Sequence, residues 1–216
     1  MHDLLTSRSC YNPSRCDAQV DQMTDVFVRA FTGDVSNLAL VGGNWTLADD
    51  MYRSRIRATL LAGEVYVVTS GPSSEIVSVG LWFAPGTAIF ATEEERSEGF
   101  NDFIAKLSPE GQAWLKRTCA TGLAALDQES FTPEDKARMW WCSGLVTRPD
   151  YQGRGHATAI MDRVYTKAAS QGEFVGLMTA TDANVPIYLH MGFIVRASAP
   201  MASPVRDFTV YYLSKE

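Results

Sequence analysis

The chain contains 216 residues, of which 46% are hydrophobic, and it carries a formal net charge of −6. This length and apolar content suit one well-packed α/β domain and exclude intrinsic disorder as the dominant state. The negative charge argues against a nucleic-acid-binding protein, which normally presents a basic face, and it modestly favours a cationic partner such as an amine.

The sequence shows neither targeting nor membrane signals. No stretch approaches the roughly 18 continuous apolar residues of a membrane span, and residues 1–11 lack the basic and apolar regions of a secretory signal. No CxxC pair suggests a metal site. We therefore expect no metal, a cytoplasmic location, and free buried thiols rather than a disulfide or a catalytic thiol. The cysteines concerned are Cys10, Cys16, Cys119 and Cys142.

The first half of the chain predicts two helices followed by a β-hairpin. Residues 17–31 and 47–61 space their apolar side chains at the helical period, and a glycine follows each segment. Residues 65–69 and 76–83 are rich in β-branched and aromatic side chains, and the turn residues 71–74 separate them. These two runs are expected to pair as neighbouring strands.

The second half predicts strands and helices that follow a helical insertion. Residues 92–137 are polar with apolar side chains at helix-like spacing, which indicates one or two helices, with Pro109 and Pro133 as breaks. This insertion could form a lid over a binding site or cover an edge of the sheet. The whole order describes a single α/β domain, 1–216, with a mixed sheet. Strands are expected at 139–146, 174–181, 193–197 and 208–213, and helices at 158–170 and 185–191.

A glycine-rich segment joins the strand at 139–146 to the helix at 158–170. Small residues let the backbone approach a ligand closely, and N–H groups at a helix N-terminus favour an anion such as pyrophosphate. Its arginine could add a charge-assisted contact or point into solvent, and a tight turn without a ligand is the alternative. The segment comprises Gln152, Gly153, Arg154, Gly155, His156 and Ala157.

Two nucleotide-binding patterns fit this segment less well. The dinucleotide fingerprint needs a third glycine where Thr158 stands, and it normally follows a first strand. The phosphate loop of nucleotide triphosphatases is excluded because no Gly-Lys-Ser/Thr follows.

Two motifs are present in a defined order. Gln152, Gly155 and Ala157 match the pattern Gln/Arg-x-x-Gly-x-Gly/Ala after a strand. One helix and one strand later, Asn184 precedes a short aromatic-bearing segment that ends in Gly-Phe at 192–193. In this order and spacing, the chain resembles the GNAT superfamily of acetyl-CoA-dependent N-acetyltransferases over residues 139–197.

The resemblance implies a fold and a cofactor site. The fold would be a GNAT-like mixed central sheet with flanking helices, splayed fourth and fifth strands, and the helical insertion (about 92–137) before the fourth strand. Acetyl-CoA, as acyl donor, would lay its pantetheine arm in the gap, against the backbone of Leu145, Val146 and Thr147. The amides of 152–157 would hold the pyrophosphate, while Asn184 and Tyr188 would contact the arm from the other side.

The resemblance also suggests catalytic roles. Tyr188 is the expected general acid for the departing thiolate, since a well-placed phenol can protonate it, and packing on the sheet is the alternative. Asn184 could instead cap the short helix. His190 is expected at the surface or near a cofactor phosphate.

The sequence identifies no general base. Glu64 opens a strand, and residues 93–95 are expected to be solvated glutamates that favour a helix N-terminus. Met178 and Thr179 stand where many members of the superfamily carry a carboxylate on the fifth strand. A chain of water molecules is therefore the default route for the amine proton.

The implied reaction is transfer of an acetyl group from acetyl-CoA to a primary amine of a small molecule or peptide by direct attack. A coenzyme A-binding module without turnover, or an acyltransferase with another acyl chain or an oxygen acceptor, remain alternatives. The expected partners are acetyl-CoA and the amine, with no nucleic acid and no membrane, in a monomer or homodimer.

Overall fold

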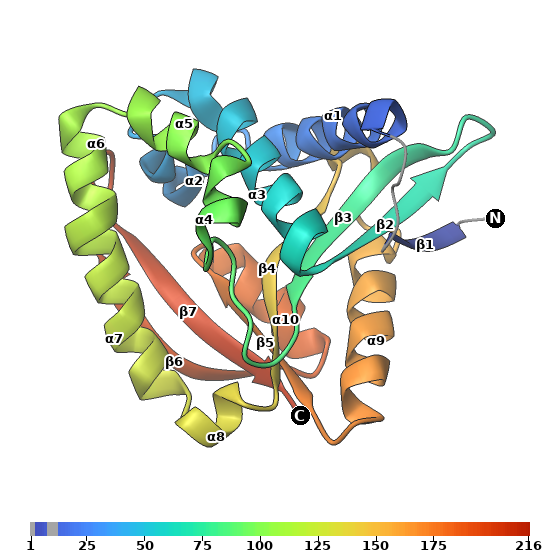
Figure 1. The fold of residues 1–216 in the computed structure, drawn as a ribbon. Coiled ribbons are helices and arrows are strands. Elements are labelled where there is room, and N and C mark those ends of the chain that lie inside the picture. The colour runs from blue at the N-terminus through green and yellow to red at the C-terminus, as the bar shows by residue number, and fades with distance from the viewer. Residues whose placement is uncertain (1–2, 8–12) are drawn as a thin grey trace.

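A computed structural model describes residues 3–7 and 13–216, and Figure 1 shows its fold. Within these residues one seven-stranded sheet has the order β1-β2-β3-β4-β5-β7-β6. Strands β4 and β5 are parallel and the other neighbours are antiparallel, so the sheet is mixed, as predicted. The first strand was not predicted. The strands are β1 (Asp3–Ser7), β2 (Glu64–Ser70), β3 (Glu75–Phe83), β4 (Met139–Thr147), β5 (Phe174–Thr179), β6 (Ile194–Met201) and β7 (Phe208–Lys215).

The predicted helices are present, but the insertion is more divided than expected. It contains α4 to α8 and a π-helical segment, Trp114–Cys119, so the prediction of one or two helices was wrong. Pro109 and Pro133 stand at the starts of α6 and α8, where the missing N–H costs nothing. The helices are α1 (Pro13–Ala30), α2 (Val35–Leu40), α3 (Ala48–Ala62), α4 (Glu93–Ser97), α5 (Phe100–Lys106), α6 (Pro109–Ala113), α7 (Ala120–Ser130), α8 (Pro133–Lys136), α9 (His156–Ala169) and α10 (Val185–His190).

Helices cover both faces of the sheet (Figure 1). Successive residues of a strand point to opposite faces. In β2, Val65 and Val67 pack with α1 and α3, whereas Tyr66 and Val68 pack in the cluster that contains the buried face of α9. Because both faces are covered, β2 is buried along almost its whole length.

The insertion packs against the end of the sheet formed by β6 and β7, as Figure 1 also shows. Trp114 is buried there, and its indole N–H donates to the carbonyl of Ala202 at 2.7 Å. Leu126 and Phe131 belong to the same apolar cluster as Val210 of β7. The insertion therefore does cover this part of the sheet, which was one of its two predicted roles.

Strands β4 and β5 separate partway along their length. Their pairing runs from Met139 opposite Phe174 to Cys142 opposite Leu177 and then stops. Beyond that point β4 continues beside β3 and β5 continues beside β7. Ser143 has no counterpart on β3, so a β-bulge marks the point of separation. This fork is the splayed strand pair that the sequence analysis predicted.

The described thiols are free, as predicted. Cys119 and Cys142 are buried and make no disulfide, whereas Cys10 and the side chain of Cys16 lie outside the described residues. Among the described residues, no helix combines the length and the hydropathy needed to cross a membrane.

Candidate active site

A pocket of about 140 Å³ opens at the fork between β4 and β5. Both strands line it, together with helices α1 to α3 on one side and α10 on the other. Residues of the insertion and of β6 and β7 complete the wall. The lining includes Asn37, Tyr52, Arg55, Cys142, Ser143, Leu145, Thr179, Asn184 and Tyr188.

The glycine-rich segment forms an open turn at the start of α9. Gly153 and Gly155 have φ values of +72° and +79°, and a Cβ added at either would meet no atom within 4 Å. Gly155 precedes the helix, and no side chain caps its first N–H groups. Unsatisfied N–H groups and the positive end of a 14-residue helix both suit an anion. The segment is therefore not blocked by its own side chains.

The polar side chains of this segment are held by the protein. Gln152 donates its amide N–H to the carbonyl of Thr147 at 3.1 Å, which ties the turn to the end of β4. Arg154 lies over the ring of Tyr151 and donates to the carbonyl of Asp150, so it does not extend over the turn. His156 is buried beside Tyr151. The side chains thus leave the backbone as the ligand-facing part of this segment.

The three β4 residues predicted to bind the pantetheine arm occupy different environments. Leu145 lines the fork pocket. Val146 is buried against α1 and α3, and its carbonyl accepts from the hydroxyl of Ser78. Thr147 is buried, and its hydroxyl also bonds Ser78. Beyond Cys142, the β5 side of this backbone has no strand partner.

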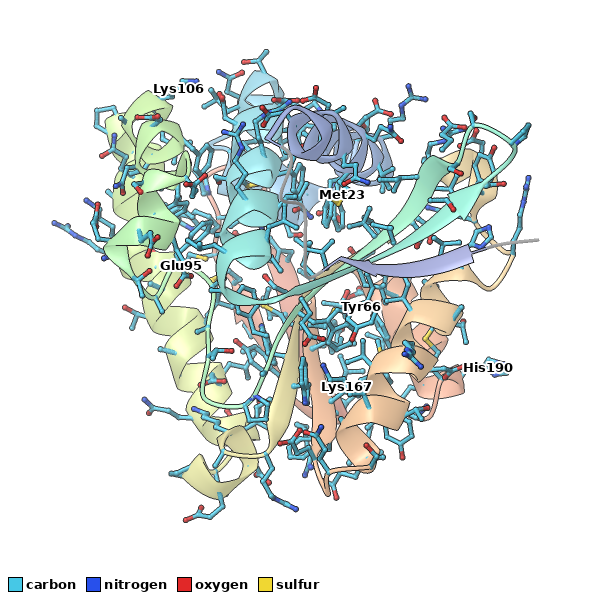
Figure 2. All side chains as sticks on the ribbon, turned by 45° about the vertical axis from the view of Figure 1, so that its right-hand side comes forward. Met23, Tyr66, Glu95, Lys106, Lys167 and His190 are labelled. Carbon is cyan, nitrogen blue, oxygen red and sulfur yellow. The ribbon has the colours of Figure 1, made fainter. Side chains whose placement is uncertain are left out.

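Asn184 and Tyr188 are brought together at the pocket. They are four residues apart at the start of α10, so they lie on the same side of that helix. The Asn184 amide donates to the hydroxyl of Thr179 at 3.3 Å and makes no helix-capping bond, so the alternative capping role is not realised. Tyr188 packs edge-on against Phe193, and burial raises its pKa, so its hydroxyl stays protonated. His190 is exposed and lies at the outer surface (Figure 2).

Comparison with known proteins gives a consistent assignment. A family model described as acetyltransferase (GNAT) domain matches residues 108–196, which include the fork, the glycine-rich segment and α10. Residues 108–196 thus match the GNAT acetyltransferase domain. The resemblance seen in the sequence is thereby confirmed, and with it the prediction of an acyltransferase. The GNAT family uses acetyl-CoA as its co-substrate. No curated protein sequence matches the chain significantly.

Solved structures share the GNAT fold at low sequence identity. An acetyltransferase from Corynebacterium glutamicum related to histone acetyltransferase HPA2 has a TM-score of 0.63 and 17% identity, over 99% of this chain and 95% of its own. A mosquito arylalkylamine N-acetyltransferase-like protein has a TM-score of 0.67 and 10% identity, over 100% and 99%. The polyamine N-acetyltransferase of Drosophila melanogaster has a TM-score of 0.60 and 10% identity, over 98% and 99%.

The charged side chains in the pocket lining limit its acid–base chemistry. Its lining contains no carboxylate and no histidine, whereas Arg55 of α3 supplies a guanidinium. Burial raises the pKa of Cys142 to about 12, so its thiol stays protonated at neutral pH. The described part of the pocket therefore holds no side chain that could accept a proton from an amine near neutral pH.

The carboxylates considered in the sequence have structural roles. Glu64 is buried and forms an ion pair with Lys167 at 2.6 Å, while the Tyr66 hydroxyl donates to it at 2.8 Å. Figure 2 shows Lys167 and Tyr66 near each other, beside α9. Glu95 is buried, which corrects the prediction of a solvated charge. Its carboxylate accepts from the backbone N–H of Ala91 and from the Thr92 hydroxyl at the start of α4.

Several pocket residues escaped the sequence analysis. Tyr52 and Arg55 come from α3, and Asn37 from α2, where it accepts a hydrogen bond from the Tyr52 hydroxyl at 2.8 Å. The signal for Arg55 was present, because it follows Met51 by four residues on the apolar side of α3. A charged residue inside an apolar stripe is a candidate for a specific role.

Proposed function

We propose that the protein is an N-acetyltransferase that transfers the acetyl group of acetyl-CoA to a primary amine of a small molecule or peptide by direct attack. The observation that carries this proposal is the fork between β4 and β5, with an unblocked glycine turn at one end and a pocket at the other. The chain 1–216 would act as a single domain.

The order of these features along β4 suggests how acetyl-CoA would bind. The N–H groups at the start of α9 would hold the pyrophosphate. From there the pantetheine arm would run along the unpaired side of β4, past Thr147 and Leu145, in the place of a missing strand. Ser143 is the first residue after the pairing ends, so an arm on this path brings its thioester to the pocket. Holding thioester and amine together removes much of the entropic barrier to their encounter.

The proposed reaction needs one proton donor and one proton acceptor. The amine nitrogen attacks the thioester carbonyl carbon, a C–N bond forms and the C–S bond breaks. The thiolate takes the proton of the Tyr188 hydroxyl, and solvent later returns one. Burial raises the pKa of Tyr188 because it disfavours the phenolate. The same surroundings also disfavour the coenzyme A thiolate, so the transfer of the proton removes one destabilised anion as it forms another.

The amine proton would leave to water. A base is absent from the described lining of the pocket, so the amine must arrive neutral. A peptide α-amine, with a reference pKa of about 7.7–8.0, supplies more neutral amine at pH 7 than a lysine side chain at about 10.4. This favours acceptors whose amines are only weakly basic.

A thiol-release assay tests the proposal. Acetyl-CoA would be offered with amino acids, N-terminal and lysine peptides, arylamines, aminoglycosides and polyamines, and acetylated products identified by mass. We expect at least one amine to be acetylated at a rate that depends on its concentration. Absence of acetyl-CoA binding at millimolar concentration would refute the assignment.

One observation favours a second candidate, a coenzyme A-binding module without turnover. The pocket lining offers no carboxylate or histidine as a base. This candidate predicts tight binding of acetyl-CoA, no acetylated product with any amine, and no effect of Tyr188→Phe on slow thioester hydrolysis. Turnover that falls in Tyr188→Phe would discard it.

We also propose a cytoplasmic location, because the described thiols Cys119 and Cys142 are free and buried, as is usual in a reducing compartment. The state would be a monomer or homodimer, without nucleic acid, membrane or metal. No group of metal-binding side chains is found in the described part of the chain.

A further inference from the structure

Arg55 stands at the apex of the fork. Its guanidinium donates to the carbonyl of Ser143 at 2.6 Å and lies 3.1 Å from the Ser143 hydroxyl. Ser143 is the bulged residue at which β4 and β5 part. On the path proposed above, the thioester ends at this residue, so Arg55 lies beside the reacting groups.

Arg55 differs from its neighbours on α3 in having no carboxylate partner among the described residues. Arg53 forms ion pairs with Asp21 and Asp49, and Arg57 with Asp17. The carboxylate of Asp34, at the start of α2, is used by other partners: it accepts from Ser36, Asn37 and Thr181. A guanidinium keeps its charge at all physiological pH values, and holding it partly buried without an anion costs free energy.

The hydrogen bonds of the Arg55 guanidinium to other described residues use a single nitrogen, Nη2. A guanidinium has five N–H donors in a planar fork, which matches a carboxylate in a bidentate arrangement. The other N–H donors of the guanidinium are therefore available to an anion that enters the pocket.

A second, larger pocket continues beyond Arg55. Its volume is about 540 Å³, and Leu40, Arg55, Cys119 and Leu123 line it together with the fork pocket. The insertion supplies most of its remaining wall, which is mainly apolar and aromatic and contains no carboxylate. This wall includes Phe100, Phe103, Ile104 and Leu115, together with the polar Asn101 and the cationic Lys116. The apolar body of an acceptor would fit here, while its polar end reaches the fork.

We propose that Arg55 binds a carboxylate of the acceptor, so that the substrate is a primary amine carrying a nearby carboxylate and an apolar body, as in an apolar amino acid. This proposal rests on the proposed acetyltransferase function. The small fork pocket admits only the polar end of such a molecule, with its amine at the thioester and its carboxylate on Arg55. The free carboxylate of a dicarboxylic acyl group, carried by coenzyme A as a thioester, could bind Arg55 by the same chemistry. The experiment therefore separates a carboxylate on the acceptor from one on the acyl donor.

The experiment compares phenylalanine, phenylalaninamide and 2-phenylethylamine as acceptors at one pH, with kcat/KM expressed per concentration of the neutral amine. We expect the wild-type protein to favour phenylalanine by about 10- to 100-fold, the contribution of one charge-assisted pair. In Arg55→Met the ratio of kcat/KM for phenylalanine to kcat/KM for 2-phenylethylamine falls to about 1, whatever change in rate the three acceptors share. Arg55→Lys keeps the positive charge but lacks the planar set of N–H donors, so it retains part of the preference for phenylalanine. Arg57→Met, which removes an exposed ion pair from the same helix, is the matched control and keeps the full preference.

Two further arms keep the outcomes distinct. The binding of N-acetylphenylalanine and N-acetylphenylalaninamide to the coenzyme A complex, measured by calorimetry, tests Arg55 without any turnover. If the protein acetylates no acceptor but binds the acid more tightly than the amide, only the proposed function fails. Succinyl-CoA against butyryl-CoA, both with 2-phenylethylamine, tests the acyl source. An equal loss of activity on all acceptors in Arg55→Met would assign Arg55 to holding the β-bulge and overturn the proposal. So would equal binding of acid and amide by the wild-type protein, or a carboxylate preference seen only in the acyl arm.

Discussion

Replacing Gly155 by alanine tests whether the turn before α9 holds acetyl-CoA. Gly155 has a φ of +79°, and a Cβ there would meet no protein atom within 4 Å. The substitution therefore lowers the free energy of unfolding only through the strain of an alanine in the left-handed conformation, about 1–2 kcal/mol. The reduced conformational entropy of the unfolded chain offsets about 0.4–1 kcal/mol of this loss. A net loss near 1 kcal/mol lowers the Tm by roughly 2–4 °C for a chain of this size.

The effect on acetyl-CoA should be larger than the effect on stability. The added methyl group would stand in the space proposed for the pyrophosphate, and it would displace one or two charge-assisted hydrogen bonds from the first N–H groups of α9. Each such bond contributes about 1.5–3 kcal/mol, so losing one raises the Kd of acetyl-CoA by roughly 10- to 100-fold. Isothermal calorimetry measures this Kd directly.

Gly172 provides the matched control at the other end of the same helix. Its φ is +71°, and a Cβ there would also meet no atom within 4 Å. Gly172→Ala should therefore lower the Tm by a similar amount and leave the Kd of acetyl-CoA unchanged. If both variants weaken binding equally, or if Gly155→Ala does not weaken it at all, the turn is not the pyrophosphate site.

Three other measurements test the mechanism and the fold. Tyr188→Phe keeps the ring against Phe193 but removes the hydroxyl, so kcat should fall about 100-fold while acetyl-CoA binds as before; an unchanged kcat contradicts the general-acid role. Because only the neutral amine attacks and the described pocket lining supplies no base, kcat/KM should rise with pH through the pKa of the acceptor itself, about 8 for a peptide α-amine and about 10.4 for lysine. A rise at one common pH for both acceptors would instead reveal a base on the protein. Lys167→Met removes the ammonium from the buried Glu64, which should cost about 3 kcal/mol in denaturant unfolding without loss of acetyl-CoA affinity. A stability equal to that of the wild type would show that this ion pair contributes nothing.

The sequence predicted the parts of the site that depend on local pattern. Gly153 and Gly155 indicated a tight turn at a helix start, and both have positive φ in the structure. Asn184 and Tyr188 were suggested by the resemblance to the GNAT superfamily, and the structure places them four residues apart at α10. The number of helices in the insertion was not predictable in the same way. Short helices such as α6 and α8 form through their caps at Ser108 and Thr132 and through packing on the sheet.

The residues missed were those whose neighbours are distant in the chain. Arg55 and Ser143 are 88 residues apart, and only the register of β4 with β3 and β5 brings them together. No periodicity along one segment could reveal that pair. The apolar stripe of α3 does single out Arg55, but the stripe alone gives no indication of what the guanidinium contacts.

Net charge illustrates the difference between a global and a local property. The value of −6 favoured a cationic partner, yet both pockets contain no carboxylate in their lining and together present Arg55 and Lys116. Charges in solvent are screened beyond about 8 Å at physiological ionic strength, so the acidic outer surface has little influence inside the fork. In the proposed binding mode, the side chains that line the fork would select the acceptor, and a guanidinium without a carboxylate partner in the described lining would favour an anion. In the same binding mode, a polyamine would place a second ammonium beside Arg55 with no carboxylate in the described lining to receive it, so we expect polyamines to be the least favoured acceptors.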